Sequence, residues 1–149
     1  MADNAAAVLR RWYEGVWIEG REEVMEELAA PDLILHGIGG PGQIMRGVEA
    51  YKPFYRSIRA AFPDIRLTVE EAIGERDIAA LRWSATMTHT GEALGFPPTH
   101  KRIAITGMSF CRLRDGKIVE SWDNWDMMGL MHEIGQTPHA EVVPLNSAG

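Results

Sequence analysis

The residues best suited to chemistry lie in one short segment, Ser121–Met128, where two aspartates stand among tryptophan and methionine. A carboxyl group enclosed by such apolar side chains loses its hydration, and its pKa rises towards neutrality. Such a group can act as a general acid or base. The segment therefore contains a candidate catalytic carboxylate, which is either Asp123 or Asp126.

The strand that carries these two aspartates decides which of them faces inwards. In a regular strand Asp126 shares the side of Trp122, whereas Asp123 shares the side of Trp125. A β-bulge would exchange the two sets. Asp126 could also cap a helix that begins at Met127, a position for which aspartate is well suited.

Histidines form the second group of chemistry-bearing residues. His36 and His89 each end an apolar segment with strand character, where a neutral imidazole could exchange hydrogen bonds with a substrate oxygen. Either could instead be a core histidine with one hydrogen bond. None of the five histidines has the spacing of a zinc site, so we expect no metal. Cys111 lies within a predicted strand without a local base, which indicates an inert buried thiol.

Two other features, Glu120 and a glycine-rich segment, do not point to one specific function. Glu120 could lie at the mouth of a cavity or pair with Arg82. The segment Gly37–Gly42 matches the glycine pattern of dinucleotide-binding loops, but the proline and glycine that follow delay the next helix to about Val48. We therefore expect a lid or turn there and no nucleotide cofactor.

The spacing of apolar residues predicts the elements that position these groups. Helical spacing predicts helices over about Asn4–Val16, Arg21–Ala30, Val48–Phe62 and Met127–Ile134. Alternation predicts strands over Leu33–His36, Ile65–Val69, Ile78–His89, Lys101–Arg114 and Lys117–Trp125. Segregated helices and hairpin-linked strands indicate an α+β fold. A long meander around one helix can curl into a cone with one open mouth, which is a natural pocket for a small molecule.

Length and composition limit the classes of function. The 149 residues favour a single domain over residues 1–135, followed by a tail over residues 136–149. The formal net charge of −6 disfavours nucleic acid and anionic membranes as partners. We find no apolar run of membrane-spanning length and no secretory leader. Together with the single cysteine, these features favour a cytoplasmic protein.

Several short motifs occur in an order that resembles the SnoaL-like polyketide cyclases of the NTF2-like superfamily. They are Ala61-Phe62-Pro63-Asp64, Thr88-His89-Thr90-Gly91, Pro98-Thr99-His100-Lys101, the run Asp115–Trp122, Asp126 and Ile134-Gly135, with His36-Gly37 and Arg46-Gly47 upstream. The resemblance covers roughly residues 5–135. It implies a cone in which a curved antiparallel sheet wraps around N-terminal helices.

The resemblance also implies a cofactor-independent enzyme of the cyclase, isomerase or lyase type, which closes a ring by an intramolecular aldol reaction. An aspartate late in the last strand is the acid/base of the family, and Asp126 matches it here, with His36 and His89 in plausible assisting positions. The substrate would be an apolar carbonyl compound such as a polyketide. We expect the pocket wall to include Tyr13, Tyr51, Tyr55, Trp83 and Trp122.

Two functions of other classes stay open at this point. The same cone could be a non-catalytic module for binding a small molecule or for dimerisation. It could also hydrolyse an epoxide, as related limonene-type enzymes do with an Asp-Arg-Asp set. The second aspartate of that set is absent after Arg82, so Asp123 or Glu120 would have to stand near a bound water. By analogy with similar open sheets, we expect a homodimer.

Overall fold

A computed structural model describes residues 4–39, 42–92 and 95–135 of the chain. The expected tail over residues 136–149 lies outside these described residues. The elements are α1 (Ala5–Trp12), a π-helix η1 (Tyr13–Ile18), α2 (Glu23–Leu28), β1 (Ala29–His36), β2 (Ile44–Arg46), α3 (Val48–Ala61), β3 (Arg66–Glu75), β4 (Ile78–Thr88), β5 (Arg102–Arg114), β6 (Lys117–Trp125) and α4 (Met127–Glu133).

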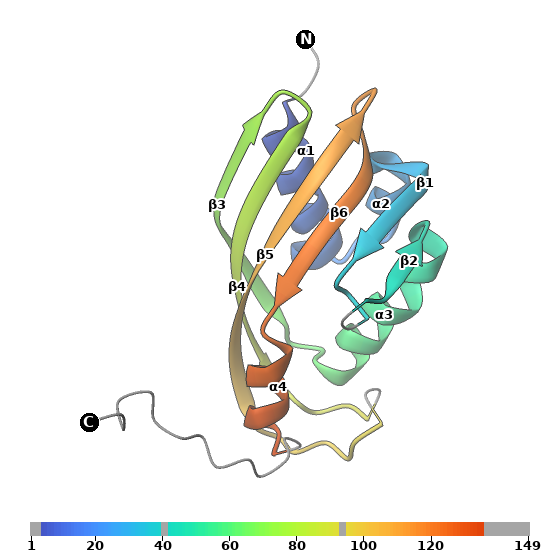
Figure 1. Ribbon diagram of the computed structural model, residues 1–149. Coiled ribbons are helices and arrows are strands. Elements are labelled where there is room, and N and C mark those ends of the chain that lie inside the picture. Colours follow the sequence, from blue (N-terminus) through green and yellow to red (C-terminus); the bar gives the residue numbers. More distant parts are fainter. Residues whose placement is uncertain (1–3, 40–41, 93–94, 136–149) are drawn as a thin grey trace, which may run out of the picture.

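The six described strands form one curved sheet in the order β2-β1-β6-β5-β4-β3. All neighbours are antiparallel except β1 and β6, which run parallel and so bring an early strand against the last one. The sheet curves around α1, and α3 lies beside it below β1 and β2 (Figure 1). This arrangement confirms the predicted α+β cone.

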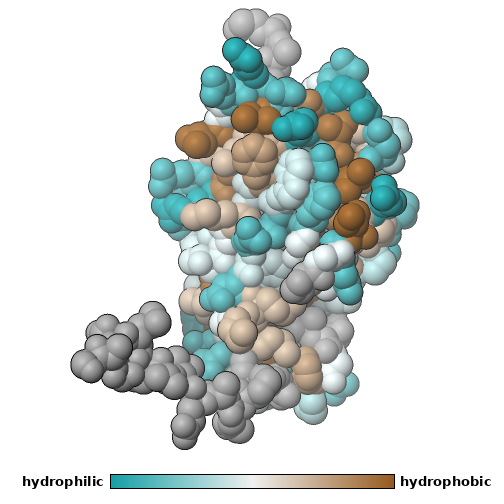
Figure 2. Space-filling view, in the orientation of Figure 1, coloured by the Kyte–Doolittle hydropathy of each residue, from teal (hydrophilic) through white to brown (hydrophobic). Residues whose placement is uncertain are grey.

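Alternating side chains divide the sheet into an inner and an outer face. Along β5, exposed and buried residues alternate without a break, as expected for a strand with one face on the core. The inner face packs against the apolar stripe of α1, which buries Val8, Leu9 and Trp12. On the outer face, apolar groups lie among hydrophilic ones (Figure 2).

The structure differs from the predicted elements in four places. The strand predicted over Ile65–Val69 is longer and runs as β3 to Glu75. Helix α1 ends at Trp12, and the chain continues as a π-helix to Ile18. Strand β1 begins at Ala29 and passes through Pro31, where its pairing with β6 is irregular and a missing N–H is tolerated. The short strand β2 follows the glycine-rich segment and was not predicted. None of the described helices is long and apolar enough to cross a membrane.

Candidate active site

An apolar pocket lies between the inner face of the sheet and the helices. Its described lining residues come from α1, η1, α3, α4, the strands and the segments that flank β1, α3 and β3, and most of them are aromatic or aliphatic. The polar ones are Tyr13, Tyr51, Ser109, Ser121, Asp123 and Asn124, together with the indoles of Trp12, Trp17, Trp83 and Trp125. One carboxylate and no basic side chain line the described part of this pocket.

Three hydroxyl groups surround the carboxylate of Asp123. Ser109 Oγ donates to Oδ1 at 2.7 Å, and Tyr13 Oη donates to the same oxygen at 3.3 Å. Ser121 Oγ donates to Oδ2 at 2.9 Å. Because a carboxylate oxygen has two lone pairs, Oδ2 keeps one for a further partner.

Burial raises the pKa of Asp123 above its usual value, although the hydroxyls of Ser109, Ser121 and Tyr13 and the positive potential of His36 act in the opposite direction. The loss of hydration therefore outweighs the hydrogen bonds. A carboxyl group whose pKa is raised towards neutrality can both accept and return a proton near neutral pH.

A β-bulge explains why Asp123 faces the pocket. Leu113 pairs with Ile118 but Arg112 pairs with Glu120, so Val119 is an extra residue in β6. Beyond this bulge the alternation is shifted, which places Ser121 and Asp123 on the inner face and Trp122 on the outer face.

Asp126 lies outside the pocket, in contrast to the expectation that it is the acid/base. Strand β6 ends one residue before it, so the alternation that was used to place it no longer applies. Its side chain is exposed, and Oδ1 accepts a hydrogen bond at 2.8 Å from the backbone N–H of Gly129, three residues on. Asp126 is thus the N-cap of α4, the other role that the sequence allowed.

Gly37, directly after the neighbouring strand β1, lies against the backbone of Asp123. It has a φ of +84°, and a β-carbon built on it would collide with the carbonyl oxygen of Asp123. Only glycine permits this approach without displacing the peptide that carries the carboxylate. Sequence reasoning missed Gly37 as a site residue, although a glycine directly after an apolar strand was a visible signal.

The π-helix η1 positions the hydroxyl of Tyr13, its first residue. Helix α3 supplies partners for two carbonyls of this element: Tyr55 Oη donates to Val16 O at 2.8 Å, and Arg59 Nη1 donates to Trp17 O at 2.9 Å. Tyr55 does not line the described pocket, in contrast to the prediction, because its hydroxyl is directed to the backbone of η1. π-Helical turns are frequent at functional sites.

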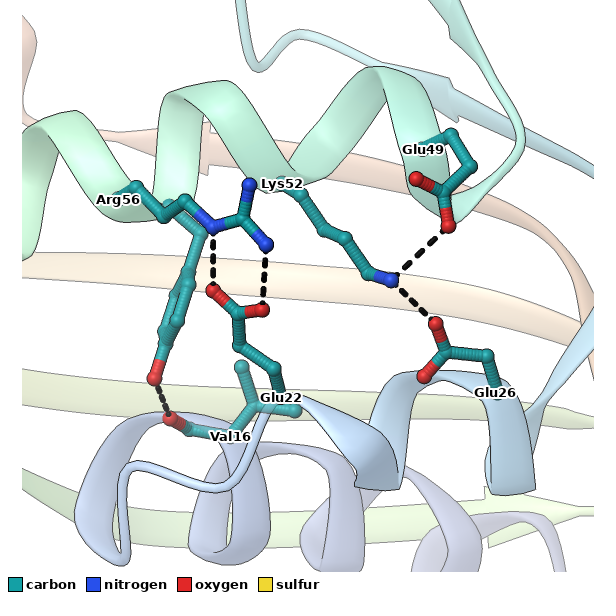
Figure 3. A network of polar contacts seen from close by, with 7 residues as sticks. Val16, Glu22, Glu26, Glu49, Lys52 and Arg56 are labelled. Carbon is teal, nitrogen blue, oxygen red and sulfur yellow. Dashed lines mark hydrogen bonds and ion pairs between the residues drawn. The ribbon is translucent and has the colours of Figure 1, made fainter.

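Ion pairs continue this contact between α3 and the segment that follows η1 (Figure 3). Arg56 donates two hydrogen bonds to Glu22, at 2.7 and 2.8 Å. Lys52 bridges Glu26 of α2 and Glu49 of its own helix. These exposed pairs contribute little individually, so the buried Tyr55 hydrogen bond is the stronger part of the contact.

Tyr51 contributes a second hydroxyl group to the pocket. Its oxygen accepts a hydrogen bond from Trp17 Nε1 at 3.1 Å, and no described residue accepts the proton of this hydroxyl. Burial and the negative charge of Asp123 raise the pKa of Tyr51 well above its usual value. Tyr51 therefore stays a neutral phenol that can donate to a ligand oxygen.

His36 and Trp122 lie on the outer face of the sheet, contrary to the expectation that both face the cavity. Leu35 is buried on the inner face, so its neighbour His36 must point outwards. His36 Nε2 lies 2.7 Å from Glu120 Oε2, and its ring stacks on Trp122 at 5.2 Å. Arg82 pairs instead with Glu71, at 2.7 Å.

His89 is fully buried but does not line the described pocket. Its Nδ1 lies 3.3 Å from the backbone N of Thr99, which donates to it, and 3.1 Å from Thr99 Oγ1. Its ring packs on Phe62 at 5.4 Å, and Phe62 itself lines the pocket. His89 therefore connects Thr99, in the segment after β4, with Phe62 of the core, and it does so without lining the pocket itself.

Tyr13, Tyr51 and Trp83 are the predicted wall residues that the structure brings together in the pocket. Cys111 is buried in β5, where loss of hydration and the charge of Asp123 raise the pKa of its thiol to about 12. No cluster of three or more His, Cys, Asp or Glu residues in the described part of the chain is arranged to hold a metal ion.

The chain belongs to the SnoaL-like polyketide cyclase family, whose model matches residues 7–134. This assignment confirms the resemblance drawn from the motifs. No curated protein matches the sequence significantly.

Solved structures support the same fold. Wild-type IdmH, a candidate polyketide cyclase from Streptomyces antibioticus, is 31% identical over 89% of this chain and 99% of its own, with a TM-score of 0.77. AclR, a candidate hydroxylase from Streptomyces galilaeus, is 28% identical over 90% of this chain and 82% of its own, with a TM-score of 0.77. The family and these neighbours support a cyclase- or isomerase-type role in general terms.

Proposed function

We propose that this protein is a cofactor-independent cyclase or isomerase that acts on an apolar carbonyl compound, with Asp123 as the general acid/base. The observation that carries the proposal is a carboxylate with a raised pKa in an apolar pocket, held by three hydroxyl groups. Asp123 replaces Asp126, His36 and His89 as the proposed catalytic group, because only Asp123 of these four lines the described pocket.

The proposed reaction is an intramolecular aldol closure without net proton loss. Oδ2 of Asp123 accepts a proton from the carbon between two carbonyl groups, and the electron pair of the broken C–H bond moves into an enolate. The enolate carbon then forms a C–C bond to another carbonyl carbon of the same molecule. Asp123 returns its proton to the alkoxide that results, which restores the carboxylate.

Tyr51 is the proposed donor for the enolate oxygen. Its hydroxyl has an unused proton, lies in the pocket and stays protonated at neutral pH. A donor that is already fixed before the reaction stabilises the developing charge without having to reorganise. The apolar wall excludes water, which strengthens this interaction.

Deuterium exchange at the α-carbon of ethyl 2-methylacetoacetate tests the proton abstraction without knowledge of the natural substrate. We expect the wild-type protein to accelerate exchange over buffer, and Asp123→Asn to lose about 10²- to 10⁴-fold of this acceleration. The matched control is Asp126→Asn, which keeps a good helix cap and should exchange at the wild-type rate.

An Asp123→Asn variant that exchanges as fast as the wild type contradicts the proposal. A wild-type protein that binds the ester without exchanging it favours the non-catalytic alternative. Epoxide hydrolysis by the limonene-type route lacks support, since Arg82 is on the outer face with Glu71 and the described pocket contains one carboxylate.

A further inference from the structure

The free volume inside the pocket is small, at about 80 Å³. An engineered apolar cavity that admits benzene measures about 150 Å³, and pockets for drug-sized ligands measure about 300–1,000 Å³. The enclosed space is therefore smaller than one ring needs, so part of a single-ring ligand would lie at the open side of the pocket, and fused rings would fit less well still. The pocket volume thus limits the size of the substrate.

Trp83 and Gly107 account for much of this restriction. The indole of Trp83 lies 6.5 Å from the ring of Tyr13, centre to centre, so it stands close to the carboxylate site. Gly107 pairs with Trp83 across the strands, and a β-carbon on Gly107 would collide with the indole. The indole of Trp83 therefore packs directly against the backbone of β5 at Gly107, and it cannot move further away from the pocket.

Two partly exposed aromatic residues narrow the pocket mouth. Phe54 of α3 and Trp125 of β6 line the pocket and are among its few lining residues with exposed surface. Their rings meet edge to face at 6.0 Å. The pocket is thus confined at its mouth as well as at its inner wall.

The charge of the lining restricts the substrate further. Asp123 is anionic once it ionises, and no described lining residue carries a positive charge to offset an acidic ligand. An anion in this apolar space would lose hydration without gaining a partner.

We infer that the substrate is a compact, uncharged carbonyl compound with a short chain or a single ring, and that Trp83 seated on Gly107 is the residue that excludes fused rings. This inference rests on the proposed function, since it concerns the same pocket. It narrows the proposed substrate class from apolar carbonyl compounds in general to those small enough for the space that the lining residues leave.

Binding measurements on a series of ketones test the size limit. Dissociation constants of cyclohexanone, α-tetralone and anthrone are measured for the wild type, Trp83→Leu and Trp122→Leu. We expect the wild type to bind anthrone at least about tenfold more weakly than cyclohexanone, and Trp83→Leu to reverse this order. Trp122→Leu is the matched control, because Trp122 lies on the outer face and should leave the order unchanged.

The charge limit is tested with methyl cyclohexanecarboxylate and cyclohexanecarboxylate. The ester should bind and the anion should bind at least about tenfold more weakly.

For the size limit, Phe54→Leu replaces Trp83→Leu if circular dichroism shows that Trp83→Leu does not fold. It should likewise favour the larger ketones.

Two results overturn the inference: wild-type protein that binds anthrone as tightly as cyclohexanone, or an unchanged order of affinities in a folded Trp83→Leu variant. Both concern binding and leave the exchange assay untouched. If the order of affinities holds but no Asp123-dependent exchange occurs, the proposed reaction fails while the size limit stands.

Discussion

Asp123 experiences two opposing influences, because burial favours its neutral form whereas three hydroxyl donors favour its anion. These donors stabilise the anion, but the carboxyl group of Asp123 still ionises less readily in the folded protein than it would in water. A buried carboxyl group with a raised pKa lowers the free energy of unfolding at neutral pH.

The raised pKa of Asp123 predicts how stability depends on pH. Below the ordinary aspartate pKa of about 3.9, the carboxyl group is protonated in both states and costs nothing. As the pH rises from there through the raised native pKa, the unfolded state ionises more easily, so the free energy of unfolding falls. Each tenfold weakening of the acid corresponds to about 1.4 kcal/mol.

Asp123→Asn should remove this dependence. We expect a higher melting temperature than the wild type at neutral pH, by about 2–4 °C per kcal/mol, and a gap that closes as the pH approaches the ordinary aspartate pKa. Thermal unfolding monitored by circular dichroism over a pH series gives both values. An equal gap at every pH would show that ionisation of Asp123 is not the cause.

At the scale of elements, the parallel pairing of β1 with β6 aligns the strand that carries Asp123, and Gly37, directly after β1, lies against the backbone of Asp123. Gly37→Ala should destabilise the protein by about 2 kcal/mol or more, because strain at positive φ adds to a backbone collision. Gly42→Ala is the control, since Gly42 has a φ of +74° with nothing within 4 Å of a built β-carbon. Urea denaturation of both variants should give a clearly larger loss for Gly37→Ala.

Tyr55 links helix α3 to the π-helix. Tyr55→Phe should cost about 1 kcal/mol of stability, because a buried carbonyl loses its donor. Glu22→Gln, which removes only an exposed ion pair with Arg56, should change the free energy of unfolding much less. Equal losses in denaturant titrations of the two variants would contradict this ranking.

Sequence patterns predicted the elements well where the cause is local. Strict alternation placed β4, β5 and β6 within one residue of their observed ends. The π-helix was not predicted, and a bulge in β6 could be named only as an alternative, because distant contacts stabilise both features. Helix α3 supplies partners for η1, and pairing with β5 fixes the bulge at Val119. This bulge, together with the end of β6 before Asp126, is also why the sequence left the choice between the two aspartates open.

At the scale of the whole molecule, the outer face of the sheet exposes large apolar side chains. Ile73 of β3 is 69% exposed, and Met108 and Phe110 of β5 are 59% and 37% exposed, on the two strands that flank β4. Exposed apolar side chains that gather on one face can mark an interaction site. Charged residues of both signs lie beside them on the same face, with Arg82 paired to Glu71 and Arg112 opposite Glu120, so the face is compatible with a self-complementary interface. Homodimerisation through this face therefore stays our prediction.

Analytical ultracentrifugation tests the predicted dimer. Phe110→Glu should shift the protein towards the monomer, because a charge placed in an apolar interface is costly to bury. Met128→Glu is the control, since Met128 is exposed on α4 and lies off the sheet. A monomeric wild type, or a Phe110→Glu variant that associates as strongly as the wild type, would refute this interface.

The parallel pairing of β1 with β6 also has a consequence for how the chain acquires its site. Residues 36 and 122 become neighbours only after nearly the whole domain has been synthesised. Contacts between positions so far apart in sequence form late and slow down folding. A nascent chain that ends before β6 therefore has neither the carboxylate nor the strand pairing that aligns it, and the pocket is completed only when the last strand enters the middle of the sheet.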